Sequence, residues 1–298
     1  MLPLEVVRLT ELMSHTSGRP EVRIGLIDGP VVAGHTGLAG GHIRQVSTDA
    51  GIKCLHLNSV ACRHATFVAG ILSGKRNSLP PAICPGCTLL VYPVFTEAVS
   101  GQDRMPSATP LELASAIIAC IDAGATIINL SLGLTQASAS GSRVLEEALN
   151  YAARNDVIVV AAAGNQSTVG SSVITRHPWV IPVVACDRMG RPLEESNLGS
   201  SIGRWGLRAP GDNITSLSAE GGSLTLSGTS VAVPFVTGTI ALLWSAFPAA
   251  TATQIRFATT KTGSPQRASI VPPLLNAAAA YQTLLKASGG GNLHDERK

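Results

Sequence analysis

Four polar residues, each beside an apolar segment, carry the groups needed to attack a carbonyl: Asp28, His64, Asn165 and Ser230. A serine hydroxyl becomes a strong nucleophile when an adjacent imidazole takes its proton, and a carboxylate that accepts a hydrogen bond from that imidazole fixes the tautomer. A side-chain amide can donate a hydrogen bond to the oxyanion that then forms. Together, the four residue types indicate acyl transfer.

Ser230 directly precedes a long apolar segment, residues 231–248, which we expect to form a buried helix. The first N–H groups of a helix have no partner within it, and the helix dipole favours negative charge there. Polar and helix-breaking residues inside the segment argue against a membrane span. We expect Pro234 in the first turn, where no helical hydrogen bond is lost. A plain N-terminal capping serine is the alternative for this fragment alone.

The other three residues occupy positions that suit the same chemistry. His64 opens a short apolar helix, whereas Asp28 follows the apolar run 22–27 and Asn165 follows the run 157–163. If both runs are parallel strands, Asp28 and Asn165 lie at the carboxyl edge of the sheet, where ligand sites of open α/β folds gather. Each has a plainer alternative: a structural histidine, a turn aspartate and a capping asparagine.

Strand-like and helix-like segments alternate along the chain, which predicts an α/β fold with a parallel sheet. The expected strands are apolar runs at 22–27, 88–95, 125–130, 157–163 and 179–186. The expected helices include one that starts after Thr109, one over 142–153 and one from Thr251 to about Thr260; Thr109 and Thr251 each begin a capping box. We expect one domain over residues 1–287 and a disordered tail over 288–298.

Composition excludes several classes of function. Charged residues are 14% of the chain and the net charge is +3, with no basic run of the kind that binds nucleic acid. Glu5, Arg8 and Glu11 lie where a secretory signal would be apolar, so we expect a cytoplasmic protein without membrane attachment. No glycine-rich phosphate-binding motif follows a strand, which argues against a nucleotide-binding fold.

The six cysteines are expected to be reduced and buried, since the chain is large and shows no secretory signal. A disulfide between Cys54 and Cys62 is left open. Cys84 and Cys87 have the spacing of a zinc ligand pair, but no second pair exists. The loop 73–77 after His64 is basic and lacks calcium-binding carboxylates. We therefore predict no metal and no cofactor.

The chain resembles the subtilases over residues from about 22 to about 283. The family's motifs occur here in order as Asp28-Gly29-Pro30-Val31, His64-Ala65-Thr66-Phe67, Asn129-Leu130-Ser131-Leu132-Gly133, Ala161-Ala162-Ala163-Gly164-Asn165 and Gly228-Thr229-Ser230. The resemblance implies a subtilisin-like three-layer fold and a serine endopeptidase that acts through an acyl-enzyme. It makes Asp28, His64 and Ser230 the catalytic triad and Asn165 the oxyanion donor. Ala65, Phe67 and Val231 depart from the usual family residues without removing a group that the mechanism needs.

Two further stretches are similar to the subtilases of cyanobactin maturation: Asp28 to Val31 with His35, and Ile83 to Cys87 leading into Val91 to Phe95. Those enzymes cut leader or follower segments from ribosomally made precursor peptides in the bacterial cytoplasm. The short spacing from Asp28 to His64 leaves no room for the helical insertion of the macrocyclising relatives, so the resemblance favours hydrolysis.

The resemblance also implies where a peptide substrate docks. One edge is formed by Ser131, Leu132 and Gly133 with Ala162 and Gly164, and a second by Ser100 and Gly101. A further hypothesis is that Arg176 selects acidic or polar residues near the cut, with a solvated surface arginine as the alternative. A broad degradative protease and a non-catalytic peptide-binding module also remain open, as does the oligomeric state.

Overall fold

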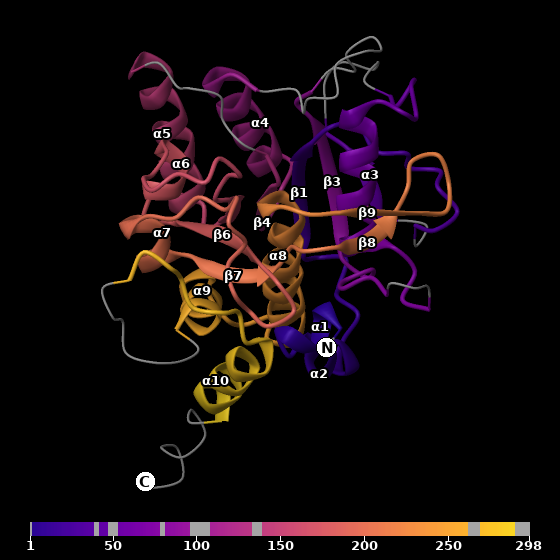
Figure 1. Ribbon diagram of the computed structural model, residues 1–298. Coiled ribbons are helices and arrows are strands. Elements are labelled where there is room, and N and C mark those ends of the chain that lie inside the picture. The colour runs from indigo at the N-terminus through magenta and orange to yellow at the C-terminus, as the bar shows by residue number, and fades with distance from the viewer. Residues whose placement is uncertain are drawn as a thin grey trace, which may run out of the picture.

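A parallel seven-stranded sheet forms the centre of the computed structural model, which describes residues 2–38, 42–46, 53–77, 81–95, 108–132, 139–261 and 269–289. The strand order is β2-β3-β1-β4-β5-β6-β7 (Figure 1). The strands are β1 (Arg23–Asp28), β2 (Ile43–Gln45), β3 (Thr88–Pro93), β4 (Ile127–Leu130), β5 (Ile158–Ala162), β6 (Val180–Cys186) and β7 (Leu207–Pro210).

The five predicted strands are confirmed as β1, β3, β4, β5 and β6. Residues along β4, β5 and β6 are buried throughout, as expected for strands covered on both faces. The sheet edges β2 and β7 were not predicted, because each is too short and too mixed in polarity to form an apolar run.

Helices cover both faces of the sheet and make a three-layer α/β fold, which confirms the predicted class. One core contains α2 (Leu9–His15), α3 (Val60–Ser73), α8 (Thr229–Ala246), α9 (Ala252–Thr260) and α10 (Ala277–Gly289). The other contains α4 (Pro110–Asp122), α5 (Ala139–Arg154) and α6 (Val173–Arg176). Two short helices, α1 (Pro3–Val6) and α7 (Ser200–Trp205), and a hairpin of β8 (Ile214–Leu217) and β9 (Ser223–Leu226) complete the described elements.

The predicted helix starts at the two capping boxes are confirmed. The Thr109 hydroxyl accepts the N–H of Glu112 at 3.2 Å, and Thr251 accepts the N–H of Gln254 at the same distance. α10 continues to Gly289, past the expected boundary at 287, and residues 290–298 lie outside the described residues.

Two local predictions were wrong. α3 begins at Val60, with Ser59 as its cap, so His64 lies in the second turn and does not open the helix. Pro234 is the sixth residue of α8 and not in its first turn. Because proline has no N–H, the helix there lacks the bond that would otherwise reach the carbonyl of Ser230, four residues earlier.

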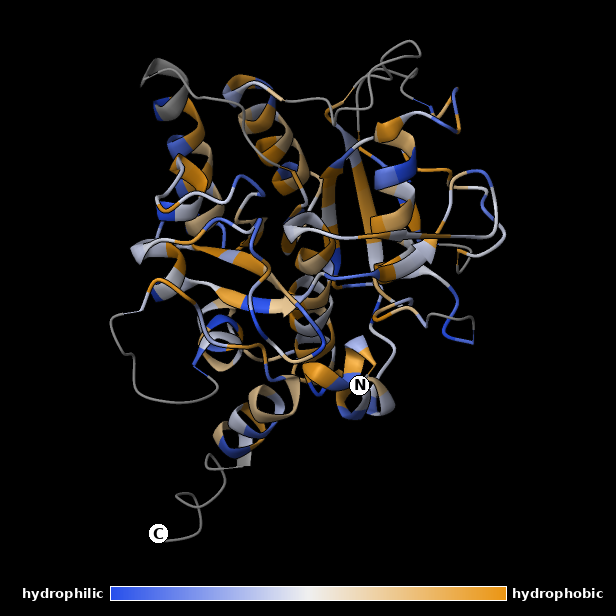
Figure 2. Ribbon diagram, viewed as in Figure 1, coloured by the Kyte–Doolittle hydropathy of each residue, from blue (hydrophilic) through white to orange (hydrophobic). Residues whose placement is uncertain are grey.

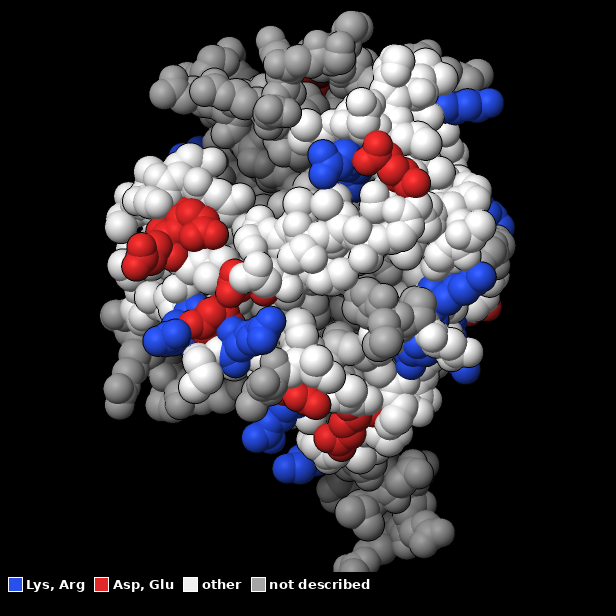
Figure 3. All heavy atoms as spheres, turned by 45° about the vertical axis from the view of Figure 1, so that its right-hand side comes forward, with Lys and Arg blue, Asp and Glu red and all other residues white. Residues whose placement is uncertain are grey.

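α8 is the one described helix long and apolar enough to match a membrane span by length and composition, and most of it is buried inside the protein. Figure 2 shows the same separation along the chain: apolar residues mark the strands and α8, while polar residues mark the outer turns. On the face in Figure 3, cationic and anionic side chains are scattered around a broad uncharged surface, as the low charged fraction predicts.

Cys54 and Cys62 form a disulfide, and their Cα atoms lie 5.7 Å apart. The possible disulfide between these two residues is therefore present, and the expectation that all six cysteines are reduced was wrong for this pair. The other four cysteines are free and buried, as predicted.

Candidate active site

The register of the sheet brings the predicted site segments to one edge. Ile27 of β1 pairs with Leu130 of β4, and Leu130 pairs with Ala161 of β5. All three strands are parallel, so the residues that follow these three lie side by side at the carboxyl edge: Asp28, Ser131 and Ala162.

Asp28, His64 and Ser230 form a continuous hydrogen-bonded row. The Nδ1 atom of His64 lies 2.9 Å from Oδ1 and 3.0 Å from Oδ2 of Asp28. The Nε2 atom of His64 lies 3.0 Å from Oγ of Ser230. Asp28 is fully buried, whereas Ser230 is half-buried at the start of α8. The row thus runs from a buried carboxylate to a hydroxyl that solvent reaches.

The turn after β1 packs directly on α3, which carries His64. A Cβ atom at Gly29 would lie 2.3 Å from the carbonyl oxygen of Ala61, so only glycine permits this approach. The Gly29 N–H also donates to Oδ1 of Asp28 at 2.8 Å. Gly29 therefore sets both the orientation of the carboxylate and its separation from the imidazole.

The environment of His64 acts on its pKa in opposite directions. Burial lowers the pKa, but the charge of Asp28 and the hydrogen bond from Nδ1 to that carboxylate raise it. The net result is a pKa above the ordinary value of 6.5. The imidazole is therefore a stronger base than one in water, and it keeps the neutral form in alkaline solution.

Asn165 lies beside the start of α8 and is held by a residue that the sequence analysis did not single out. The N–H and the hydroxyl of Thr229 both donate to Oδ1 of Asn165 at 2.9 Å. Gly228, at φ 129°, passes close to Nδ2, where a Cβ atom would lie 3.0 Å away. Since Oδ1 is occupied by Thr229, the amide orientation leaves Nδ2 as the group available to donate. Thr229 was visible in the Gly-Thr-Ser motif, but its role required coordinates.

The predicted peptide-docking residues fall into two groups. Ser131, Leu132, Ala162 and Gly164 lie at the carboxyl edge beside the row, and the Gly164 N–H donates to the Thr229 hydroxyl at 3.2 Å. Gly133, Ser100 and Gly101 lie outside the described residues.

A buried polar chain joins this edge to α8. The Thr237 hydroxyl donates to Oδ1 of Asn129, and Nδ2 of Asn129 donates to Oγ of Ser131, both at 2.8 Å. All three side chains are fully buried. The chain fixes Ser131 relative to the helix that carries Ser230.

Arg176 and His177 lie away from the row. They precede β6, whose first residue is at the amino edge of the parallel sheet, opposite Asp28. His177 is buried and its Nε2 lies 3.2 Å from Oδ1 of Asn150, and burial lowers its pKa. This location argues against Arg176 as a reader of residues near a cut.

The four free cysteines have pKa values that are shifted by burial or by contact with each other. Burial raises the pKa of Cys120 and of Cys186 to about 12. The thiol of Cys84 donates to Cys87, which raises the pKa of Cys84 and lowers that of Cys87. Within the described ranges, no group of three or more His, Cys, Asp or Glu side chains is arranged to hold a metal ion.

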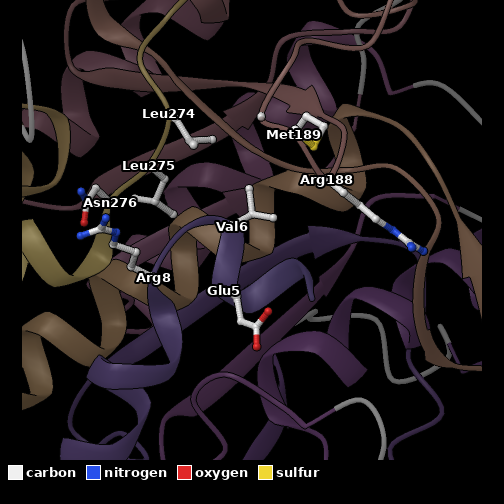
Figure 4. Close-up of a pocket in the computed structure, with 9 residues that line it drawn as sticks. Glu5, Val6, Arg8, Arg188, Met189, Leu274, Leu275 and Asn276 are labelled. Carbon is white, nitrogen blue, oxygen red and sulfur yellow. The ribbon is translucent and has the colours of Figure 1, made fainter. Parts of the chain in front are cut away.

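A cavity of about 440 Å³ lies apart from the row, between α1, the turn after β6 and the segment before α10. Its charged lining residues are Glu5, Arg8 and Arg188. Figure 4 shows Arg8 and Arg188 extending away from each other, with Glu5 turned in a third direction. These side chains do not converge on a common point, so the cavity lacks the arrangement of a reaction centre.

Comparison with known proteins identifies the class to which this fold and this row of side chains belong. The model of the subtilase family matches residues 19–291. The chain therefore belongs to the subtilase family of serine endopeptidases, as its motifs indicated.

Individual relatives and solved structures support the same family. The thermostable alkaline protease of Halalkalibacterium halodurans is 36% identical over 194 residues, which are 65% of this chain and 50% of that protein. The protease domain of PatA is 33% identical with a TM-score of 0.80, covering 91% of this chain and 97% of that chain. The prenylagaramide maturation protease PagA is 29% identical with a TM-score of 0.79, covering 93% and 98%. The predicted likeness to peptide-maturation subtilases is thereby confirmed. The chain spans about half the length of the curated relatives it matches first.

Proposed function

We propose that this chain hydrolyses peptide bonds, with Ser230 as the nucleophile and His64 as the general base. The observation that carries the proposal is the row Asp28–His64–Ser230, with two hydrogen-bonded contacts of 2.9 and 3.0 Å. His64 takes the Ser230 proton as the hydroxyl attacks the scissile carbonyl, and the Asp28 carboxylate stabilises the imidazolium that forms.

Asn165 and the backbone N–H of Ser230 then hold the oxyanion. Thr229 engages Oδ1 of Asn165, which leaves Nδ2 to donate, and the Ser230 N–H belongs to the first turn of α8, where helix N–H groups have no internal partner. The imidazolium returns its proton to the leaving amine. An acyl-enzyme results, and water activated by the same imidazole releases it.

The substrate proposed for this chemistry is a ribosomally synthesised precursor peptide from which a leader or follower segment is removed. The likeness to PagA, named as a maturation protease, and to the protease domain of PatA supports this choice. The peptide would lie as an added strand along Ser131 and Leu132, beside Ala162 and Gly164. A broad degradative protease and a non-catalytic peptide-binding module are the alternatives.

A diverse pool of synthetic peptides, incubated with the protein and with its Ser230→Ala variant, separates these functions by mass spectrometry of the products. We expect cuts by the wild type alone, within a narrow set of sequences. Cuts at many unrelated sequences would support a degradative protease. Peptides that both proteins bind but do not cut would support a binding module. Equal cutting by the variant would exclude Ser230 as the nucleophile.

A further inference from the structure

Cys84 and Cys87 form a pair of thiols that the proposed mechanism does not use. They begin and end the turn Cys84-Pro85-Gly86-Cys87, in which the Cys87 N–H donates to the Cys84 carbonyl at 3.0 Å. A four-residue turn closed in this way holds its outer Cα atoms less than about 7 Å apart, and a disulfide needs about 4.4–6.8 Å. The backbone of the turn is therefore suited to a bond between the two sulfur atoms.

The two side chains also contact each other. Both thiols are free, and the Cys84 S–H donates to the sulfur of Cys87. This hydrogen bond lowers the pKa of Cys87 against the effect of burial, and together with burial it raises the pKa of Cys84. Because the thiolate is the attacking form in disulfide exchange, Cys87 is the nucleophile of the pair. The Arg76 guanidinium, which donates to the Ile83 carbonyl at 2.6 Å, places a positive charge beside Cys84.

The pair lies just beneath the surface, against a glycine. Cys84 and Cys87 are buried, but the two residues between them are partly exposed. Gly18 packs on Cys87, since a Cβ atom added to this glycine would lie 2.5 Å from the sulfur. Gly18 belongs to the linker between α2 and β1, and the residues on both sides of it are exposed. A local opening of this linker would therefore expose the sulfur to a small molecule.

The other two free cysteines lack these features and serve as internal controls. Cys120 is buried in α4 and Cys186 is buried at the end of β6. Burial raises the pKa of each to about 12, and no other cysteine in the described part of the chain contributes to either shift. We therefore expect both thiols to be far less reactive than Cys87.

The turn joins two elements that position the reacting row. The N–H groups of Ile83 and Cys84 donate to the carbonyls of Ile71 and Leu72, in the last turn of α3, at 2.8 and 2.9 Å. Directly after Cys87 the chain enters β3, which pairs with β1 along its whole length. A bond across the turn would therefore reinforce the connection between α3 and the sheet.

We propose that Cys84 and Cys87 are a reversible redox site, at which a low-molecular-weight disulfide such as oxidised glutathione is exchanged for an intramolecular disulfide. The Cys87 thiolate attacks the small disulfide, which forms a mixed disulfide and releases one small thiol. The Cys84 thiolate then attacks the sulfur of Cys87 and releases the second small thiol. The two protons lost by the protein pass to the two small thiols, so the pair is oxidised and the small disulfide is reduced. This site goes beyond the proposed function and does not depend on it.

Oxidised glutathione tests the site in the whole native chain. The reaction is quenched in acid, the free thiols are alkylated after unfolding, and the peptides are mapped by mass spectrometry. We expect the Cys84–Cys87 bond to form over hours, because the linker must open first, and excess reduced glutathione to reverse it. Cys120 and Cys186 should be modified at least about tenfold more slowly. Cys84 and Cys87 that stay free, or modification of all four cysteines at one rate, would overturn the proposal.

Variants with one thiol of the pair assign the two roles. In Cys84→Ser, Cys87 should be trapped as a mixed disulfide with glutathione, because no second thiol can displace it. In Cys87→Ser, Cys84 should stay free over the same time. Cys120→Ser is the matched control and should form the Cys84–Cys87 bond at the wild-type rate. Equal trapping in the two pair variants, or trapping of Cys84 alone, would overturn the assignment of Cys87 as the nucleophile.

Thermal unfolding measures the effect of the bond on the fold. A disulfide that fits the native turn restricts the unfolded chain, so the oxidised wild type should unfold a few degrees above the untreated protein. Cys87→Ser, in which the bond cannot form, should keep its Tm after the same treatment. An oxidised wild type that unfolds below the untreated protein would show that the turn must distort to accept the bond, which contradicts the proposal.

Discussion

In the proposed mechanism, the reactivity of Ser230 depends on the protonation state of a single imidazole, so it depends on pH. The base form of His64 is needed, and its pKa lies above 6.5 because the effects of Asp28 exceed that of burial. We predict that kcat/KM rises with pH with a midpoint above 6.5. In Asp28→Asn the rate should fall by about 10⁴-fold, as in another serine protease, and the midpoint should move down, since burial then acts alone. An unchanged midpoint in that variant would contradict the assignment of Asp28.

The raised pKa also links His64 to stability. A group whose pKa is higher in the folded state stabilises the fold below its unfolded pKa, and this contribution is lost as the pH rises through the folded pKa. The His64 contribution should thus decline from pH 6.5 upward. Thermal unfolding of the wild type and of His64→Gln, compared across this range, measures the contribution. A difference in Tm that stays constant with pH would exclude it.

Asn165 should contribute to the rate without contributing to substrate binding. We predict that Asn165→Ala lowers kcat by about 10²–10³-fold with little change in KM, because the amide Nδ2 bonds to the substrate only as the oxyanion develops; this size is known from another subtilase. Thr229→Val, which removes one of the two donors to Oδ1, should give a smaller loss of kcat, and Thr229→Ser should restore it. A loss that falls mainly on KM would place Asn165 outside the oxyanion site.

At the scale of elements, the close packing of the β1 turn on α3 decides whether Asp28 meets His64. We predict that Gly29→Ala lowers kcat/KM about 10²-fold, the order of loss for a displacement of about 1 Å, because a methyl group would push against the Ala61 carbonyl. Gly34→Ala is the matched control, since a Cβ atom there meets nothing within 4 Å. Wild-type activity in Gly29→Ala would show that this close approach does not set the position of Asp28 relative to His64.

The buried chain Thr237–Asn129–Ser131 joins α8 to the edge of the sheet where we propose that the peptide docks. Thr237→Val would leave Oδ1 of Asn129 buried without a donor, which costs about 1–3 kcal/mol. Thr237→Ser keeps the hydroxyl and should cost only about 0.8 kcal/mol for the lost methyl group. Chemical denaturation measures both free energies of unfolding. Equal losses in the two variants would assign the effect to packing and not to the hydrogen bond.

Sequence patterns predicted the elements that are long, apolar and capped, and missed those defined by their partners. The runs that became β5 and β6 are buried on both faces, so their composition alone marked them. β9 alternates between exposed and half-buried residues and is a strand because β8 pairs with it. The start of α3 was misplaced because Ser59 and Val60 precede the apolar run. Their capping pattern was the available signal.

The same limit applies to the site. Asp28, Asn165 and Ser230 could be found because each lies at the end of an apolar strand or the start of an apolar helix, and His64 because it lies inside an apolar helix. Thr229 acts through a contact across 64 residues of chain, and the close approach of Gly29 to Ala61 involves atoms from two elements. Neither contact has a signature in local sequence.

At the scale of the whole molecule, the cysteines should report an intact fold. Four are free and buried, and the remaining two are paired. We predict that a thiol reagent labels none of them quickly in the native, unreduced protein, labels four after unfolding and six after unfolding with a reductant. Rapid labelling of native Cys54 or Cys62 would show that the disulfide between them is absent from the native protein.

The most direct test of the hydrogen-bonded row is covalent capture of its nucleophile. The protein is treated with a fluorophosphonate, a reagent that phosphonylates activated serine hydroxyls, and the adduct is located by mass spectrometry of its peptides. We predict a single adduct, on Ser230, in the wild type, and a far slower reaction in His64→Ala. An adduct on another residue, or labelling of Ser230 at the same rate without His64, would contradict an activated serine at this edge of the sheet.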